Sequence, residues 1–381
     1  MEYINYKDSN EKISLLGFGC MRLPKLHEDS QEIDKVKATA MVDHALASGI
    51  NYFDTAYPYH EGLSESFVGE ALSARHPRHS FKLATKLPTW QISSRENVES
   101  IFNEQLKKCQ VEYFDYYLIH NLGKANFTIA EQFGIFDLLK KKQQQGLIGH
   151  LGFSFHDQPP LLQKIVDAHK WDFAQIQLNY MDWELQDARQ QYEILKRNDI
   201  PVIVMEPIRG GSLATLSERA VAILKQADAG ASPASWALRY AASLPGVLTV
   251  LSGMSNMAQL EDNLKTINNF RPLNDAEHAT IDQALNEYRL SGAIPCTACR
   301  YCMDCPAGVD IPKVIAIYNR HCTGENDMVF QLEYRVLGED KQAEHCVQCN
   351  MCAEQCPQVI DIPHWMEVID QYAKEVDARQ A

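Results

Sequence analysis

The fold class is decided by three short apolar runs between residues 50 and 120: Ile50-Asn-Tyr-Phe-Asp54, Phe81-Lys-Leu-Ala-Thr-Lys86 and Tyr116-Tyr-Leu-Ile-His120. Each run has the length of a buried β-strand, and each ends on a polar residue. Longer segments with helical periodicity separate the runs. This alternation predicts βα units, and therefore a parallel sheet covered by helices.

The same alternation continues on both sides of this stretch. We expect five further strands, at Ser14–Cys20, Ile148–Ser154, Phe173–Gln177, Pro201–Glu206 and Leu248–Leu251. The predicted helices are Lys35–Ala47, Ser64–Ser73, Val98–Cys109, Ile129–Gln145, Leu161–His169, Trp183–Arg197, Leu213–Gln226 and Met257–Ile267. Eight strands alternating with helices predict an α/β fold of the closed (β/α)8 TIM-barrel type. A doubly wound open sheet is the competing architecture, but no Gly-x-Gly-x-x-Gly follows the first strand.

The length and composition allow two domains. The chain has 381 residues, of which 45% are hydrophobic and 23% charged, as in an ordinary globular protein. The segment Ser291-Gly-Ala-Ile-Pro295 breaks the helical stretch Ala276–Leu290 and is the expected boundary. We therefore predict a barrel domain at residues 1–290, with an N-terminal hairpin formed by Tyr3–Tyr6 and Lys12–Leu15. A smaller, mainly helical domain at residues 291–381 follows, with helices at Ile311–Asn319 and Val329–Val336.

The charge distribution restricts the binding partners. The formal net charge of −14 argues against nucleic acid, which is bound by clustered Lys and Arg. The last 91 residues carry seven Lys and Arg against 14 Asp and Glu, an acidic surface that suits a basic electron-transfer partner. No apolar stretch approaches the roughly 20 residues that a membrane-spanning helix needs. The N-terminus lacks the pattern of a signal peptide, so we expect a cytoplasmic location.

Two cysteine runs dominate the predicted second domain. They are Cys296-x2-Cys299-x2-Cys302-x2-Cys305-Pro306 and Cys346-x2-Cys349-x2-Cys352-x3-Cys356-Pro357, and they contain eight of the 11 cysteines. Three thiolates at this spacing can hold one [4Fe–4S] cluster, and a fourth before proline suits ligation of a neighbouring cluster. The pattern predicts two [4Fe–4S] clusters in a ferredoxin-like domain.

The crossed arrangement gives each cluster one cysteine from the other run. Cys296, Cys299, Cys302 and Cys356 would bind one cluster, and Cys346, Cys349, Cys352 and Cys305 the other. The first run has two residues before its last cysteine, where bacterial ferredoxins have three, so Cys305 is the least typical ligand. Structural zinc is an alternative for paired Cys-x2-Cys units. Disulfides would require an oxidising compartment.

The polar residues near the strand ends form an ordered set in the predicted barrel. Asp54, Lys86 and His120 each end a strand, and Tyr59 follows Asp54 in its loop. Together they resemble the catalytic tetrad of the aldo/keto reductase family. The resemblance extends to Gly17-Phe-Gly-Cys-Met-Arg22, Gly152-Phe-Ser154, Gln177-Leu-Asn-Tyr180, Glu206-Pro-Ile-Arg-Gly-Gly211, Ser252-Gly-Met-Ser255 and Asp262-Asn263. With its cysteine runs, the chain resembles the subgroup that carries a C-terminal ferredoxin-type domain.

The resemblance implies a role for each member of the tetrad. Tyr59 would donate a proton to the carbonyl oxygen that receives negative charge when hydride is transferred. Lys86 would lower the pKa of Tyr59, and Asp54 would hold Lys86 in place. His120 would bind the substrate oxygen by a hydrogen bond. His60 and His156 are the alternative histidines for this role.

The resemblance also implies a nicotinamide site. Its expected residues are Met21, Asp54, Ser154, Gln177, Tyr180, Pro207, Gly210, Gly211, Leu213, Gly253, Ser255, Gln259 and Asn263. Residues 253–259 read Gly-Met-Ser-Asn-Met-Ala-Gln and lack the Lys or Arg that grips a 2′-phosphate. The cofactor is therefore expected to be NADP or NAD.

These features predict a nicotinamide-dependent oxidoreductase that interconverts a small carbonyl compound and its alcohol, with two clusters that exchange electrons or stabilise the protein. The alternative hypothesis is a non-catalytic module that reports nicotinamide redox state to a protein partner. The complete tetrad favours the enzyme.

Overall fold

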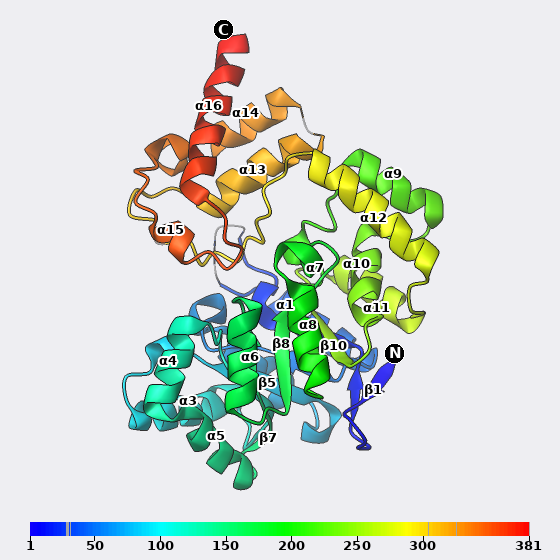
Figure 1. Ribbon diagram of the computed structural model, residues 1–381, viewed down its shortest axis with the longest axis vertical. Helices are drawn as coiled ribbons and strands as arrows, with labels where there is room; N and C mark the ends of the chain where they lie inside the picture. Colours follow the sequence, from blue (N-terminus) through cyan, green and yellow to red (C-terminus); the bar gives the residue numbers. More distant parts are fainter. Residues whose placement is uncertain (28–29, 31, 304, 325, 381) are drawn as a thin grey trace. The chain divides into compact units, whose positions relative to one another are not determined.

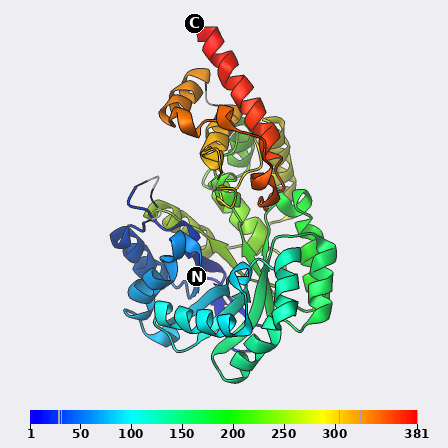
Figure 2. The same cartoon turned by 90° about the vertical axis from the view of Figure 1, so that its left-hand side faces the viewer.

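The computed structural model describes residues 1–27, 30, 32–303, 305–324 and 326–380. Eight parallel strands form a closed barrel in the order β10-β3-β4-β5-β6-β7-β8-β9. Helices lie outside these strands (Figure 2). The strands are β3 (Leu16–Gly19), β4 (Tyr52–Asp54), β5 (Lys82–Leu87), β6 (Phe114–Ile119), β7 (Ile148–Phe155), β8 (Phe173–Gln177), β9 (Val202–Met205) and β10 (Val247–Ser252). Each overlaps a predicted strand, so the barrel prediction is confirmed.

The helices follow the predicted alternation with several local differences. They are α1 (Lys35–Ala47), α2 (Ser64–Val68), α3 (Arg95–Cys109), α4 (Lys124–Phe133), α5 (Ile135–Gln144), α6 (Pro159–Ala168), α7 (Asp182–Leu185), α8 (Ala188–Arg197), α9 (Glu218–Ala227), α10 (Pro233–Ala242), α11 (Met257–Asn268) and α12 (Asp275–Leu290). The segment predicted as one helix at 129–145 divides into α4 and α5 at Gly134, whose φ is 61°. Helix α10 was not predicted from the sequence. It begins with Pro233, and the first position of a helix tolerates proline because the N–H group there has no partner within the helix.

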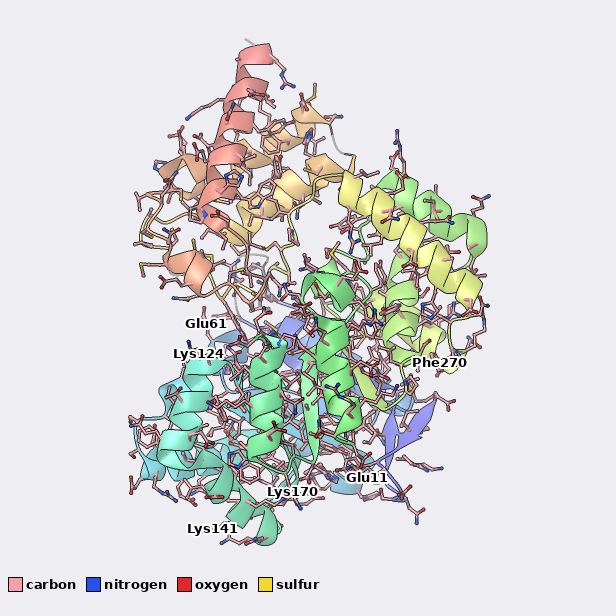
Figure 3. The ribbon with its side chains drawn as sticks, in the orientation of Figure 1. Glu11, Glu61, Lys124, Lys141, Lys170 and Phe270 are labelled. Atoms are coloured by element: carbon pink, nitrogen blue, oxygen red, sulfur yellow. The ribbon has the colours of Figure 1, made fainter. Side chains whose placement is uncertain are left out.

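An antiparallel hairpin closes the amino end of the barrel. Its strands are β1 (Tyr3–Asn5) and β2 (Lys12–Ser14), as expected. Ile4 and Tyr6 pack against buried residues of the barrel interior, such as Tyr116. Figure 3 shows Glu11 and Lys170 at this end of the barrel, and Glu61 and Lys124 at the opposite end, where the strands finish. The carboxyl ends of the strands are therefore left for a functional site.

The chain divides into two compact units. One comprises 1–207 and 237–273 and contains all eight barrel strands; the other comprises 208–236 and 274–381. The predicted boundary, between residues 290 and 291, divided the sequence at a single point. The segment 208–236 and helix α12, which we expected in the barrel domain, belong to the second unit.

The second unit is helical. Helices α9 and α12 lie side by side (Figure 1), and α13 (Ile311–Thr323), α14 (Asp327–Val336), α15 (Met351–Glu354) and α16 (Ile362–Gln380) follow. Buried residues of α13, α14 and α16 share one core with partly buried cysteines of both runs. None of the helices within the described ranges is long and apolar enough to cross a membrane.

The second unit contains an internal repeat that the cysteine spacing alone did not reveal. Cys305-Pro-Ala-Gly-Val-Asp-Ile-Pro312 corresponds to Cys356-Pro-Gln-Val-Ile-Asp-Ile-Pro363, and each is followed by a helix, α13 and α16. The two cysteine runs also share a backbone conformation. Left-handed φ angles occur at Ala298, Arg300 and Gly308, and at the equivalent Gln348, Asn350 and Val359. Such angles are costly for residues other than glycine, so the repeated turns indicate a constraint common to both runs.

The first prediction concerns Glu11, which joins the hairpin to the barrel. It accepts hydrogen bonds from Tyr116 (3.2 Å) and His150 (2.8 Å) and pairs with Lys82 at 3.3 Å. Burial alone would raise the pKa of Glu11, but the hydrogen bond and charge of His150, with Lys82, lower it to about 2. Since this pKa lies below the ordinary 4.5, Glu11 stabilises the fold above pH 4.5, and the effect is lost as the pH falls towards 2.

Glu11→Gln should therefore lower the free energy of unfolding by about 1–2 kcal/mol at pH 7, after allowance for solvent screening. Denaturant titrations at pH 7 and pH 3 measure the difference, which should shrink at pH 3. Glu112→Gln, at an exposed position, is the control and should leave stability unchanged. Equal destabilisation at both pH values would show that the charge of Glu11 is irrelevant.

Candidate active site

Four polar side chains meet at the carboxyl ends of β4, β5 and β6. The ammonium group of Lys86 donates hydrogen bonds to Asp54 Oδ1 (2.6 Å), the carbonyl of Thr55 (2.9 Å) and the hydroxyl of Tyr59 (3.2 Å). These three bonds use all of its donors. Lys86 is 1% exposed, so the ion pair with Asp54 is held away from water. The resulting geometry joins three of the four residues expected from the sequence.

Tyr59 is held by a strained loop. The two residues that follow it, His60 and Glu61, have φ angles of 52° and 54°. Left-handed conformations of this kind cost about 1–3 kcal/mol each for residues other than glycine. The loop therefore fixes where the Tyr59 hydroxyl lies. Because Lys86 donates to the Tyr59 oxygen, the proton of the phenol remains available to another acceptor.

Several groups determine the pKa of Tyr59. Burial and then the negative charge of Asp54 raise the pKa of Tyr59 well above its usual value, while Arg22 opposes the shift. The ammonium group of Lys86, which contacts the Tyr59 hydroxyl, is paired with Asp54 at 2.6 Å. Tyr59 consequently keeps its proton through the neutral range.

His120 completes the set as a neutral ring. Burial, then the positive charge of Lys86, lowers its pKa well below 6.5. Its ring centroid lies 6.2 Å from that of Tyr59 and 5.1 Å from that of Trp90. Its Nδ1 atom is buried without a hydrogen-bond partner among the described residues. A neutral imidazole near the Tyr59 ring can bind a polar oxygen without adding a charge.

The expected nicotinamide residues of the barrel are mostly buried. Ser154 Oγ accepts a hydrogen bond from the Asn121 N–H at 2.8 Å, and Gln177 Nε2 donates to Asp182 Oδ2 at 2.7 Å. The Tyr180 ring packs edge-on against Tyr240. Ser154 and Gln177 are thus held in fixed orientations near the ends of β7 and β8.

Residues expected near the adenosine half make contacts within the barrel unit. Gln259 Oε1 accepts from the Ser255 N–H at 2.7 Å, and Asn263 Nδ2 donates to Ser252 Oγ at 2.9 Å. Gly253 is exposed. A Cβ atom there would lie 3.2 Å from the side chain of Arg22.

Sequence reasoning missed the ion pair between Arg22 and Glu206. The two charged groups are 3.0 Å apart and only partly exposed, and both influence the pKa of Tyr59. Arg22 lies next to the expected cofactor residue Met21, and Glu206 next to Pro207. The sequence signal that could have indicated this pair is that Arg22 and Glu206 each belong to a motif shared with the family, Gly17–Arg22 and Glu206–Gly211.

Three of the expected cofactor residues, Gly210, Gly211 and Leu213, belong to the second unit. A Cβ atom at Gly210 would overlap the carbonyl oxygen of Thr297 in the first cysteine run, whereas Gly211 faces open space. The helix expected from Leu213 begins at Glu218, so its N-terminus does not directly follow the glycines. Gly210 is therefore required by the packing of the second unit itself.

Four cysteines from both runs surround one hollow. Cys296, Cys299, Cys302 and Cys356 line a small hollow that is partly open to solvent, together with Ile311, Ile315 and Gln358 among others. Burial raises the pKa of the Cys296 thiol to about 11 and that of Cys302 to about 12, and the neighbouring thiols of the set contribute. The structure thus brings together the first set of the crossed arrangement.

The second set lies in the same unit as the first. Burial, then the proximity of Cys346, raises the pKa of Cys352, and Cys349 contributes. Cys305 packs against the core of the second unit, as do Cys346 and Cys352. Within the described residues, no three His, Cys, Asp or Glu side chains form a site for a single metal ion. A four-iron cluster spaces its ligands at the corners of a cube, wider than the ligands of one zinc ion.

Comparisons with known proteins agree with the barrel fold. The model of the Aldo/keto reductase family matches residues 15–286, and the chain belongs to this family. It is 27% identical over 292 residues to the uncharacterized oxidoreductase YqkF of Bacillus subtilis, covering 68% of this chain and 89% of that protein. L-galactose dehydrogenase of Arabidopsis thaliana is 27% identical over 286 residues, covering 69% and 86%.

A solved structure shares the fold. The aldo-keto reductase AKR11C1 from Bacillus halodurans matches with a TM-score of 0.60 and 24% identity, over 74% of this chain and 96% of that one. The protein is thus an NAD(P)-dependent oxidoreductase that acts on carbonyl or CH–OH groups. Residues 287–381 lie outside the family match.

The pKa shifts predict the pH dependence of this enzyme. Tyr59 stays protonated and His120 stays neutral between about pH 7 and 9, so kcat/KM for carbonyl reduction should be constant in this window. If Tyr59 is the group that exchanges the proton, alcohol oxidation requires its deprotonated form and should accelerate with rising pH. Initial rates in both directions measure this. A fall in the reduction rate across the window would show that a group of lower pKa donates the proton.

Proposed function

We propose that the barrel reduces an aldehyde or ketone to an alcohol, or catalyses the reverse reaction, with Tyr59 as general acid and base. The observation that carries the proposal is the Lys86 ammonium group, which binds both Asp54 and the Tyr59 hydroxyl in a buried site. A solvated surface lysine would gain nothing from such an arrangement. Here it fixes the oxygen of the proton donor.

Each residue of the site has a separate task in this reaction. NADP or NAD, when bound, supplies or accepts the hydride. Tyr59 donates its proton to the substrate oxygen, and neutral His120 orients that oxygen by a hydrogen bond. Lys86 and Asp54 are positioning residues, because they act through the Tyr59 hydroxyl. Ser154, Gln177 and Tyr180 are proposed to hold the nicotinamide end of the cofactor.

The second unit is proposed to bind two [4Fe–4S] clusters. Four thiols around one hollow fit the first cluster, and the N–H of Ala298 donates to Cys296 Sγ at 3.3 Å, as backbone N–H groups do around cluster sulfurs. The repeated left-handed turns at Gln348 and Asn350 support the second cluster, for which Cys305 completes the set. Bound clusters would supply one-electron transfer to or from a protein partner, and their thiolates require a reducing compartment such as the cytoplasm.

Replacing the proton donor tests the barrel reaction. Tyr59→Phe should lower kcat for carbonyl reduction by about 10²–10⁴-fold, because it removes the general acid, and should leave the dissociation constant for the nicotinamide cofactor nearly unchanged. Steady-state kinetics with a generic aldehyde and either reduced nicotinamide, together with fluorescence titration of the cofactor, provide the measurement.

Tyr57→Phe is a matched control in the same loop, since the Tyr57 hydroxyl contacts Glu104 at 3.3 Å, away from Lys86. It should retain the wild-type rate. Equal rates for Tyr59→Phe and wild-type protein would eliminate Tyr59 as the acid. Cofactor binding without turnover of any carbonyl by wild-type protein would favour the redox-reporting alternative.

Metal analysis tests the clusters. Protein prepared without oxygen should contain about eight iron and eight sulfide per chain, as two [4Fe–4S] clusters require. Cys356→Ala should retain about four of each, because Cys356 belongs to the set of the first run although it lies in the second.

Cys322→Ala is the control for loss of a thiol, because Cys322 lies outside both runs, and it should retain all eight iron. Stoichiometric zinc without sulfide in wild-type protein would refute the cluster proposal. Retention of both clusters by Cys356→Ala would refute the crossed ligand sets.

A further inference from the structure

Arg209 is a buried cation beside the hollow of the first cysteine set. It is fully buried, and its Nη2 atom donates a hydrogen bond to Gln358 Oε1 at 2.8 Å. Gln358 follows Cys356 by two residues and lines the hollow. The guanidinium group therefore binds a side chain that lines the site of one proposed cluster.

The backbone conformation and the close packing around Arg209 fix its position. Arg209 itself has a left-handed φ of 51°, and Gly210 follows with 66°. Only glycine fits at position 210, because a Cβ atom would overlap the carbonyl oxygen of Thr297, which lies between Cys296 and Cys299. The turn thus places an arginine against the first cysteine run despite strain at the arginine itself.

The equivalent position of the second run has different surroundings. Thr297 is 2% exposed, whereas its counterpart Val347 is 67% exposed. Ala307 replaces Gln358 in the other copy of the repeat, so the amide that accepts from Arg209 occurs in one copy only. Two backbones of the same conformation therefore provide two electrostatic environments.

We propose that Arg209 is a built-in counter-charge for the cluster held by Cys296, Cys299, Cys302 and Cys356, and that it keeps the reduction potential of this cluster above the value that burial alone would give. The inference rests on the cluster binding proposed above. One-electron reduction adds one negative charge to a cluster with four thiolates, and no bond is formed or broken. A buried cation stabilises the reduced state more than the oxidised state, so it raises the potential.

Redox titration of the full-length protein tests the proposal. The protein is reduced stepwise with dithionite in the presence of mediators, and the reduced clusters are followed by electron paramagnetic resonance. Arg209→Gln should make reduction of one cluster at least tenfold less favourable, about 59 mV for a one-electron couple. The other cluster is the internal reference and should change much less. Arg209→Lys, which keeps the charge, should restore most of the potential.

Arg300→Gln is the matched control. Arg300 also lines the hollow, but it is 42% exposed and faces Asp310 at 3.6 Å, so solvent and the carboxylate screen its charge. In this variant, the equilibrium constant for reduction of the cluster should change by less than about threefold. A shift as large as that of Arg209→Gln would show that any positive charge near the hollow suffices, and would overturn the assignment to Arg209.

A second variant covers the case in which Arg209→Gln does not fold. Gln358→Glu keeps the arginine and places a carboxylate against it, so it should lower the same potential. Two intact clusters with unchanged potentials in Gln358→Glu, or in a folded Arg209→Gln, would overturn the inference alone. Wild-type protein without iron and sulfide would instead overturn the cluster proposal and the inference together.

Discussion

The ion pair between Lys86 and Asp54 is the interaction on which the catalytic site depends. An unpaired buried ammonium would cost several kcal/mol, and removal of one partner from such a pair typically costs about 3–5 kcal/mol. Three acceptors satisfy Lys86 completely, from the end of β4 and the loop that follows it. The position of Tyr59 is thus fixed by the same bonds that make the buried charge tolerable.

A second buried network supports this arrangement from behind. Glu65 accepts hydrogen bonds from Thr85 and Gln105, both at 2.6 Å, and Gln105 also donates to the carbonyl of Lys86 at 3.0 Å. The backbone on both sides of the Lys86 side chain is therefore held by side chains of α2 and α3. Because β5 is ordered by these bonds before any ligand binds, the site is pre-organised for the reacting atoms.

The sequence predicted those parts of the molecule that depend on local patterns. Eight strands were found from short apolar runs, since burial on both faces leaves a continuous hydrophobic signal. Asp54, Lys86 and His120 were found because a barrel exposes the residues at its strand ends. The Ile129–Gln145 segment was predicted as one helix because Gly134 interrupts the backbone without interrupting the apolar periodicity.

Features that depend on long-range packing were not predicted. The Arg209–Gln358 contact joins residues 149 positions apart, and neither side chain belongs to a recognisable motif for it. The higher pKa of Tyr59 was not predicted either, because its largest cause is burial, and the burial of a loop side chain depends on the packing of distant segments. The negative charge of Asp54 raises this pKa further. In the second unit, the buried guanidinium of Arg209 donates to the neutral amide of Gln358. Both the burial of Tyr59 and the burial of Arg209 thus arise from segments that lie far apart in the sequence, which is why neither environment is visible in a local pattern.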